Sequence, residues 1–189
     1  MPELPMRFLT FSLLVFLSGL LLPPLVVAAE LDLSQFERLA PSAYRDMLRD
    51  AATDYGAKRY DASFAKFKRL ACAGDKQSQS ALGRMYMLGQ GIKRDDLTGY
   101  AWLKLAAEVI YPKYQSVAHQ LEEAMTPEQR EIADARVAFL SARYSLGNSR
   151  MSCTLNASKG GHIIDRIICT PQREGRRLLL RICDDRDPD

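Results

Sequence analysis

Apolar residues recur at helical spacing in several stretches between residues 30 and about 147. In the clearest stretch, residues 78–88, they are Ala81, Leu82, Met85 and Leu88, which fall on one face of a helix. The region is rich in Ala, Leu, Lys, Arg, Gln and Glu, which favour helices, and lacks clusters of β-branched residues. The pattern therefore predicts a mainly α protein with residues 30–147 helical.

The pattern changes after residue 150. Short apolar runs there are separated by turn residues: the runs are 151–155, 162–170 and 177–183, and the turns are 160–161 and 171–175. This alternation predicts a β-hairpin or meander of two or three strands over residues 150–183. The helical part is expected to end near Gly147, which can take the left-handed conformation of a helix end. Residues 184–189 form an acidic tail that we expect to be disordered.

Residues 1–29 have the pattern of a secretory signal. Arg7 precedes an apolar run over residues 8–27, which Pro23 and Pro24 interrupt and which closes on Val27-Ala28-Ala29. A run of about twenty apolar residues also fits a membrane anchor, but the prolines and the small-residue exit favour cleavage after Ala29. We therefore expect a periplasmic or secreted protein with no stable membrane insertion after cleavage.

The helical part contains an internal repeat. A shift of 35 positions places residues 58–72 on residues 93–107, and residue class is kept at almost every position expected to be buried. Phe67 falls on Trp102, for example. A period in the thirties with this composition predicts stacked helix–turn–helix units, which together form a short α-solenoid.

The clearest unit runs from about residue 77 to 109. Gly83 removes a side chain in the first helix, which indicates a close approach of a neighbouring helix. Gly89-Gln90-Gly91 ends that helix, and Asp95 or Asp96 can cap the next one. This second helix carries Trp102 and the pair Ala106-Ala107.

This unit resembles the Sel1-like repeat, a relative of the tetratricopeptide repeat, through the pattern Ala81-Leu82-Gly83-x-Met85-Tyr86-x-x-Gly89-x-Gly91-Ile92-x-x-Asp95 followed by Trp102 and Ala106-Ala107. The resemblance covers this unit and, more weakly, the half-unit before it. It implies packing or turn roles for these residues, so Trp102 and Tyr86 are interpreted as core residues rather than as a ligand cage.

Residues 115–145 depart from the repeat because they have no Gly-x-Gly turn. Thr126, Pro127 and Gln129 instead predict the capped start of a new helix. We expect this helix to close one end of the stack, and a helix over residues 41–56, starting at Pro41, to close the other.

The four cysteines are Cys72, Cys153, Cys169 and Cys183. Cys153 and Cys169 flank Gly160-Gly161, so a hairpin turning there predicts a disulfide between them. Cys72 aligns with Ala107 and is expected to be a buried free thiol, with a Cys72–Cys183 bridge as the alternative.

No catalytic, metal-binding or cofactor-binding motif is present. The two histidines, His119 and His162, lie in different regions, and the pair Glu122-Glu123 is interpreted as solvated surface. The net charge of +3 gives no support for nucleic-acid binding.

The predicted function is therefore binding of another protein. The resemblance implies a non-enzymatic adaptor in the bacterial cell envelope. Arg84 and Met87 lie outside the packing consensus and are the candidates for the partner-facing surface. The alternatives are a cell-wall-related hydrolase, acting on peptidoglycan or β-lactams, and a secreted effector.

Overall fold

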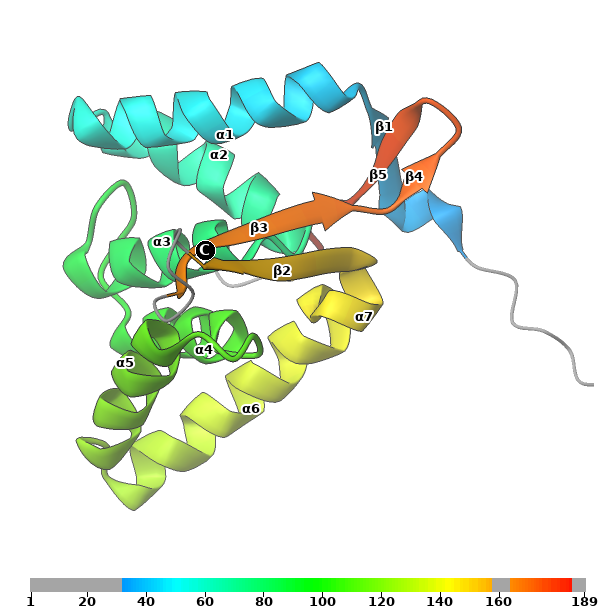
Figure 1. Ribbon diagram of the computed structural model, residues 1–189. Helices are drawn as coiled ribbons and strands as arrows, with labels where there is room; N and C mark the ends of the chain where they lie inside the picture. Colours follow the sequence, from blue (N-terminus) through cyan, green and yellow to red (C-terminus); the bar gives the residue numbers. More distant parts are fainter. Residues whose placement is uncertain (1–31, 158–163, 185–189) are drawn as a thin grey trace, which may run out of the picture. The chain divides into compact units, whose positions relative to one another are not determined.

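Three helix pairs follow one another between residues 41 and 144, and the pairs stack side by side (Figure 1). The computed structural model describes residues 32–157 and 164–184, which belong to one compact unit. Within them, the helices are α1 (Pro41–Gly56), α2 (Tyr60–Cys72), α3 (Lys76–Leu88), α4 (Asp96–Ala106), α5 (Pro112–Glu123), α6 (Pro127–Tyr144) and the single turn α7 (Leu146–Ser149). The fold is thus a short α-solenoid with a small amount of β structure, as the sequence predicts.

The strands form two small antiparallel sheets. They are β1 (Phe36–Leu39), which follows the short 3-10 helix η1 (Leu33–Gln35), β2 (Met151–Ala157), β3 (Ile164–Pro171), β4 (Arg173–Glu174) and β5 (Arg177–Arg181). The strands β2 and β3 form a hairpin, whereas β5 lies between β1 and β4. The C-terminal segment therefore shares a sheet with residues that precede the first helix.

Several predictions fall on residues outside the described part of the chain. These are the signal over residues 1–29, with its cleavage after Ala29, the turn at Gly160-Gly161 with His162, and the acidic tail beyond Asp184. They stay predictions.

Most predicted helix signals are confirmed. Asp95 caps α4 by accepting hydrogen bonds from the Leu97 and Thr98 amides, and Thr126 forms the expected capping box with Gln129 at the start of α6. Gly89 ends α3 in the left-handed conformation, with φ of 64°.

Two expectations about the ends of the helical part are wrong. Residues 36–39 are a strand, because β5 supplies backbone partners for them that lie more than one hundred positions away. Gly147 lies inside α7, and it is Arg150 that takes the left-handed conformation there, with φ of 57°.

Gly83 and Gly99 let α3 and α4 cross in close contact. A Cβ atom on Gly83 would lie 2.7 Å from the Gly99 carbonyl oxygen, and one on Gly99 would lie 2.7 Å from the Gly83 carbonyl oxygen. Each glycine therefore allows the backbone of the other helix to approach, as predicted for Gly83. The sequence interpretation did not single out Gly99.

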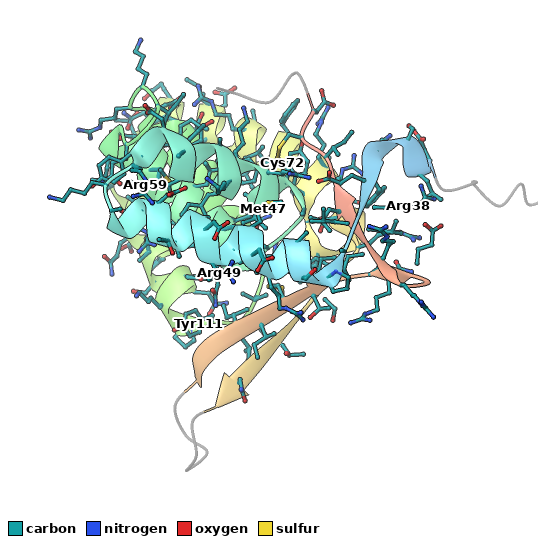
Figure 2. The ribbon with its side chains drawn as sticks, turned by 90° about the horizontal axis from the view of Figure 1, so that it is seen from above. Arg38, Met47, Arg49, Arg59, Cys72 and Tyr111 are labelled. Carbon is teal, nitrogen blue, oxygen red and sulfur yellow. A yellow bond between two sulfur atoms is a disulfide. The ribbon has the colours of Figure 1, made fainter. Side chains whose placement is uncertain are left out.

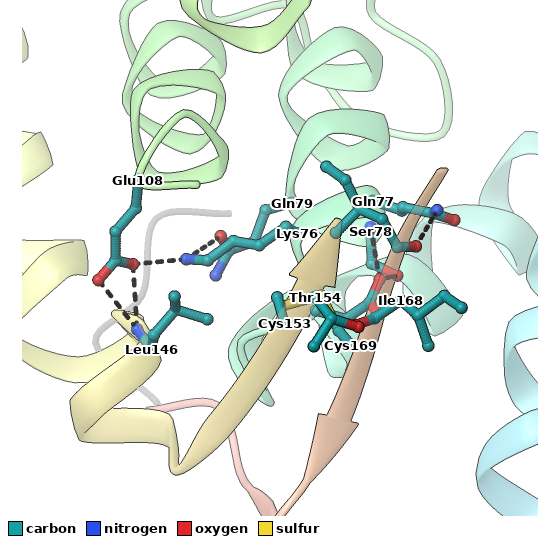
Figure 3. Close-up of a disulfide and its surroundings, with 12 residues drawn as sticks. Lys76, Gln77, Ser78, Gln79, Glu108, Leu146, Cys153, Thr154, Ile168 and Cys169 are labelled. Carbon is teal, nitrogen blue, oxygen red and sulfur yellow. Dashed lines mark hydrogen bonds and ion pairs between the residues drawn. A yellow bond between two sulfur atoms is a disulfide. The ribbon is translucent and has the colours of Figure 1, made fainter. Parts of the chain in front are cut away.

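The first turn of α3 is the point where three other helices end. The Lys76 ammonium donates to the Leu105 carbonyl of α4, and the Gln79 amide donates to the carbonyls of Ala71 in α2 and Tyr144 in α6. Lys76 also pairs with Glu108 at 2.7 Å, and Glu108 accepts from the Leu146 amide (Figure 3). Two side chains of α3 thus donate to carbonyls at the ends of three other helices, where hydrogen bonds within the helix stop.

The β2–β3 hairpin covers the helices on one side. It lies over α3, between α1 and α5 (Figure 1), and the Gln77 side chain of α3 donates to the Ile167 carbonyl of β3 at 2.7 Å. A hydrophobic cluster joins hairpin residues Met151, Ile167 and Cys169 to Tyr44 of α1 and to neighbouring apolar residues. The hairpin is therefore packed on the helical layer.

Two disulfides are present in the described chain. Cys153 faces Cys169 across the hairpin, with 4.0 Å between the Cα atoms, which confirms the predicted bridge. Cys72 is bonded to Cys183, with 5.2 Å between the Cα atoms. The expectation of a free thiol at Cys72 is therefore wrong and the alternative pairing holds. The residue lies at the end of α2, beside the C-terminal segment (Figure 2).

Replacing Gly83 by Ala is expected to lower the free energy of unfolding by about 1–3 kcal/mol, because the added methyl group forces α3 and α4 apart. Gly56→Ala is the matched control, since Gly56 is also helical but a Cβ there meets no atom within 4 Å. It should instead stabilise the protein by up to about 1 kcal/mol. Urea unfolding measures both variants, and equal effects would contradict the close crossing.

Thiol titration of the denatured, unreduced protein should detect no free thiol. Removing the Cys72–Cys183 bridge by a double Ala substitution should destabilise the fold more than removing Cys153–Cys169. The reason is that the Cys72–Cys183 bridge closes a loop of 111 positions and the Cys153–Cys169 bridge one of 16. In the chain-entropy model these loops correspond to about 5 and about 3 kcal/mol of stabilisation. Two free thiols in the wild-type protein would contradict the pairing.

Candidate functional site

A pocket of about 280 Å³ opens where α3, α5 and β3 meet. Its lining combines an apolar floor with polar and cationic walls. The lining residues are Gln77, Ser80, Arg84, Leu103, Tyr111, Lys113, Tyr114, Val117 and Ile167. The volume lies just below the range of about 300–1,000 Å³ that is usual for small-molecule sites. The pocket is therefore small.

The pocket walls are fixed by backbone and ring contacts. The bond from Gln77 to the Ile167 carbonyl holds β3 at a set distance from α3. At the start of α5, Tyr111 and Tyr114 pack edge to face with ring centroids 4.9 Å apart, and Tyr111 lies beside the hairpin (Figure 2). The pocket is therefore framed by parts that already pack against one another.

The charges at the pocket are positive. Arg84 and Lys113 are both exposed, and within the described residues neither has a carboxylate partner. Burial raises the pKa of the Tyr114 hydroxyl to about 12, partly offset by its bond with Ser80 and by the nearby Arg84 charge. Tyr114 is therefore a neutral hydroxyl next to two cations at physiological pH.

The pocket lining is polar and cationic over an apolar floor. The lining residues given above include no His, Cys, Asp or Glu, which are the usual acids, bases and metal ligands. Across the described residues, no cluster of three or more such side chains is placed to hold a metal. The arrangement can supply hydrogen-bond donors, two positive charges and an apolar floor.

The structure separates the two residues predicted to face a partner. Arg84 lines the pocket, but Met87 is half-buried and packs against α4, since a Cβ on Gly99 would meet its Cγ atom at 2.5 Å. Met87 therefore contributes to the helix crossing rather than to the pocket. The sequence interpretation missed Lys113 and the tyrosines around it, although Tyr111 and Tyr114 lie within three positions of each other at the start of α5.

The consensus residues of the repeat lie in the core or the turn. Ala81, Leu82, Gly83, Tyr86, Trp102 and Ala106 are buried, Ala107 is half-buried, and Gly89 and Gly91 form the turn after α3. Trp102 stacks on Tyr144 with ring centroids 5.7 Å apart, and Tyr86 packs edge to face on Phe64. Both rings are therefore buried and packed against side chains of the chain itself.

Glu122 forms ion pairs to two other helices, which differs from its interpretation as solvated surface. Its carboxylate pairs with Lys104 of α4 at 2.7 Å and with Arg130 of α6 at 3.3 Å. The bond to Lys104 lowers the pKa of Glu122. Glu123 remains exposed and contacts only the exposed His119 ring among its described ion-pair partners, at 3.2 Å. Glu122 thus ties α4, α5 and α6 together at the surface.

Comparison with known proteins gives a sparse result. No protein-family model matches the chain, and no curated protein is similar to it in sequence. Among solved structures, the chain is similar to a protective antigen of uropathogenic Escherichia coli strains that displays an SLR fold, with a TM-score of 0.44 and 19% identity. The match covers 55% of this chain and 23% of the antigen, so the chain spans less than a quarter of that protein.

The class of protein follows from the fold and the site themselves. The chain is a helical-repeat protein whose layer of helix pairs carries a disulfide-bridged hairpin and a cationic pocket beside it. Stacked helix pairs of this kind characteristically present extended surfaces for other molecules.

Met87→Glu should lower the free energy of unfolding by about 1–3 kcal/mol, because it places a charge at the half-buried contact with Gly99. Leu88→Glu is the control one residue along, since Leu88 is 62% exposed and should change stability by less than about 0.5 kcal/mol. Arg84→Glu should change the free energy of unfolding as little as the control does. Chemical denaturation of the three variants tests this placement, which would be wrong if Arg84→Glu were the most damaging.

Proposed function

We propose that the chain is an exported, non-enzymatic adaptor of the bacterial cell envelope, built of Sel1-like repeats, that binds another protein at the pocket around Arg84. The observation that carries the proposal is the pocket itself. It joins an exposed arginine of the best-defined repeat unit to Lys113, two tyrosines and an apolar floor. Arginine and tyrosine at the edge of an apolar depression are the residues that most often dominate protein–protein binding energy.

The hairpin supports this choice of surface. In stacked helix pairs, a partner would have the whole helical face available, but here β3 and β2 already pack on it. The pocket lies at the boundary of the covered area. A partner can therefore reach Arg84 and Val117 without displacing the hairpin.

Export is supported by the cysteines. Both disulfides join cysteines of the described chain, and such bonds persist in oxidising compartments such as the periplasm. Across the described residues, no helix has the length and apolar character needed to span a membrane.

A photo-crosslinking amino acid at Val117, which is 36% exposed in the pocket, should give light-dependent adducts with a partner in periplasmic extract, identified by mass spectrometry. The same probe at Leu88, exposed but outside the pocket, is the positional control. Arg84→Glu should remove the Val117 adducts without changing the melting temperature.

Two results would contradict the proposal. Identical adducts at both probe positions would mean that the pocket has no special role. Hydrolysis of peptidoglycan or of a chromogenic β-lactam by the purified protein would favour the enzymatic alternative over an adaptor.

A further inference from the structure

The charges that line the pocket indicate which kind of partner it binds. Most arginines in the helical layer are paired with a carboxylate of the chain itself. Examples are Arg59 with Asp54 at 2.5 Å, Arg136 with Asp95 at 2.6 Å and Arg130 with Glu122. Arg84, like Arg45, has no carboxylate against it within the described residues, but Arg84 lines a pocket whose lining also holds none.

A second cation reinforces this difference. Lys113, at the start of α5, lines the same pocket and has no carboxylate partner in the described part of the chain. Tyr114 lines the pocket as well, and its neutral hydroxyl adds a third donor. Three groups that donate hydrogen bonds, two of them charged, therefore converge on one small depression.

The floor of the pocket selects for something besides charge. Leu103 and Ile167 are 3% and 4% exposed, and Val117 at the pocket edge is 36% exposed. A purely ionic ligand such as inorganic phosphate would leave this apolar floor in water. A ligand with an apolar side chain next to a carboxylate would use both parts.

We propose that the pocket binds an acidic peptide segment of a partner protein, in which an Asp or Glu carboxylate is held by Arg84 and Lys113 and a neighbouring aliphatic or aromatic side chain lies on Leu103, Val117 and Ile167. The proposal rests on the adaptor function above and deepens it. The Arg84 guanidinium can form two parallel hydrogen bonds to one carboxylate, which a lysine cannot do.

The test is a selection from a phage-displayed library of random nonapeptides on the full-length, disulfide-intact protein. Selected peptides should be enriched in Asp or Glu next to Leu, Ile, Phe or Tyr. The same selection on the Arg84→Glu variant should lose this enrichment.

A selected peptide, made with a fluorescent label, then allows affinities to be measured by anisotropy. Arg84→Glu should weaken binding about tenfold or more, the scale of a lost charge-assisted contact, and Arg84→Lys should weaken it less. Arg176→Glu, at an exposed arginine in the turn between β4 and β5, is the matched control and should leave the affinity unchanged.

Exchanging the charges of the peptide acid and of Arg84 distinguishes direct pairing of the two groups from an effect of overall surface charge. A peptide in which Lys replaces the selected acid should bind the Arg84→Glu variant better than it binds the wild type. Raising the NaCl concentration from about 0.05 to 0.5 M should weaken the binding of the original peptide to the wild-type protein. Unchanged affinity in the Arg84→Glu variant would overturn the proposal.

Other outcomes separate this inference from the adaptor function. Crosslinking at Val117 together with selected peptides that lack acidic residues would overturn the acidic-peptide inference and leave the adaptor function standing. If no peptide is selected and no crosslink forms at Val117, the acidic-peptide inference and the adaptor function are both overturned. A dimer that dissociates when residues 185–189 are deleted would assign the pocket to a second copy's acidic tail, against a separate partner.

Discussion

The junction at the first turn of α3 is the constraint on which the rest of the structure depends. Each helix leaves its last carbonyl groups without partners, and where three helices end in the interior those groups cannot all reach water. Gln79 donates to the Tyr144 carbonyl of α6, and Lys76 and Gln79 add further donors to the Leu105 carbonyl of α4 and the Ala71 carbonyl of α2. The positive charge of Lys76 also suits the negative ends of helix dipoles. The ends of three helices are thereby held at one point.

This arrangement carries an electrostatic cost. The Lys76 side chain is fully buried, and desolvation lowers its pKa, whereas Glu108 opposes that shift. Because the attraction of the partly exposed Glu108 must offset the desolvation of Lys76, the ion pair adds little net stability. The ion pair also positions the start of α7, because Glu108 accepts a hydrogen bond from the Leu146 amide. Strand β2 follows directly after α7. The junction thus helps to fix where the hairpin begins.

The position of the hairpin changes what a repeat fold can do in this chain. An open stack of helix pairs offers a continuous face to a partner, but the hairpin and its disulfide cover the part of that face over α3. What remains next to β3 is a small pocket whose cations have no carboxylate partner in the described chain. The interaction surface proposed here is therefore local, and its selectivity depends on charge and on one apolar contact.

The sequence alone determined the features whose signals are local. The helix predicted over residues 78–88, its Gly89 end, the Asp95 cap and the capping box at Thr126 each depend on residues within a few positions of one another. The Cys153–Cys169 bridge joins residues of one hairpin that are only 16 positions apart. Only the tertiary structure decided the pairing of β1 with β5, the bond from Cys72 to Cys183 and the meeting of Arg84 with Lys113. These contacts join segments up to about 145 positions apart, and no local pattern specifies which distant segment will pack against which.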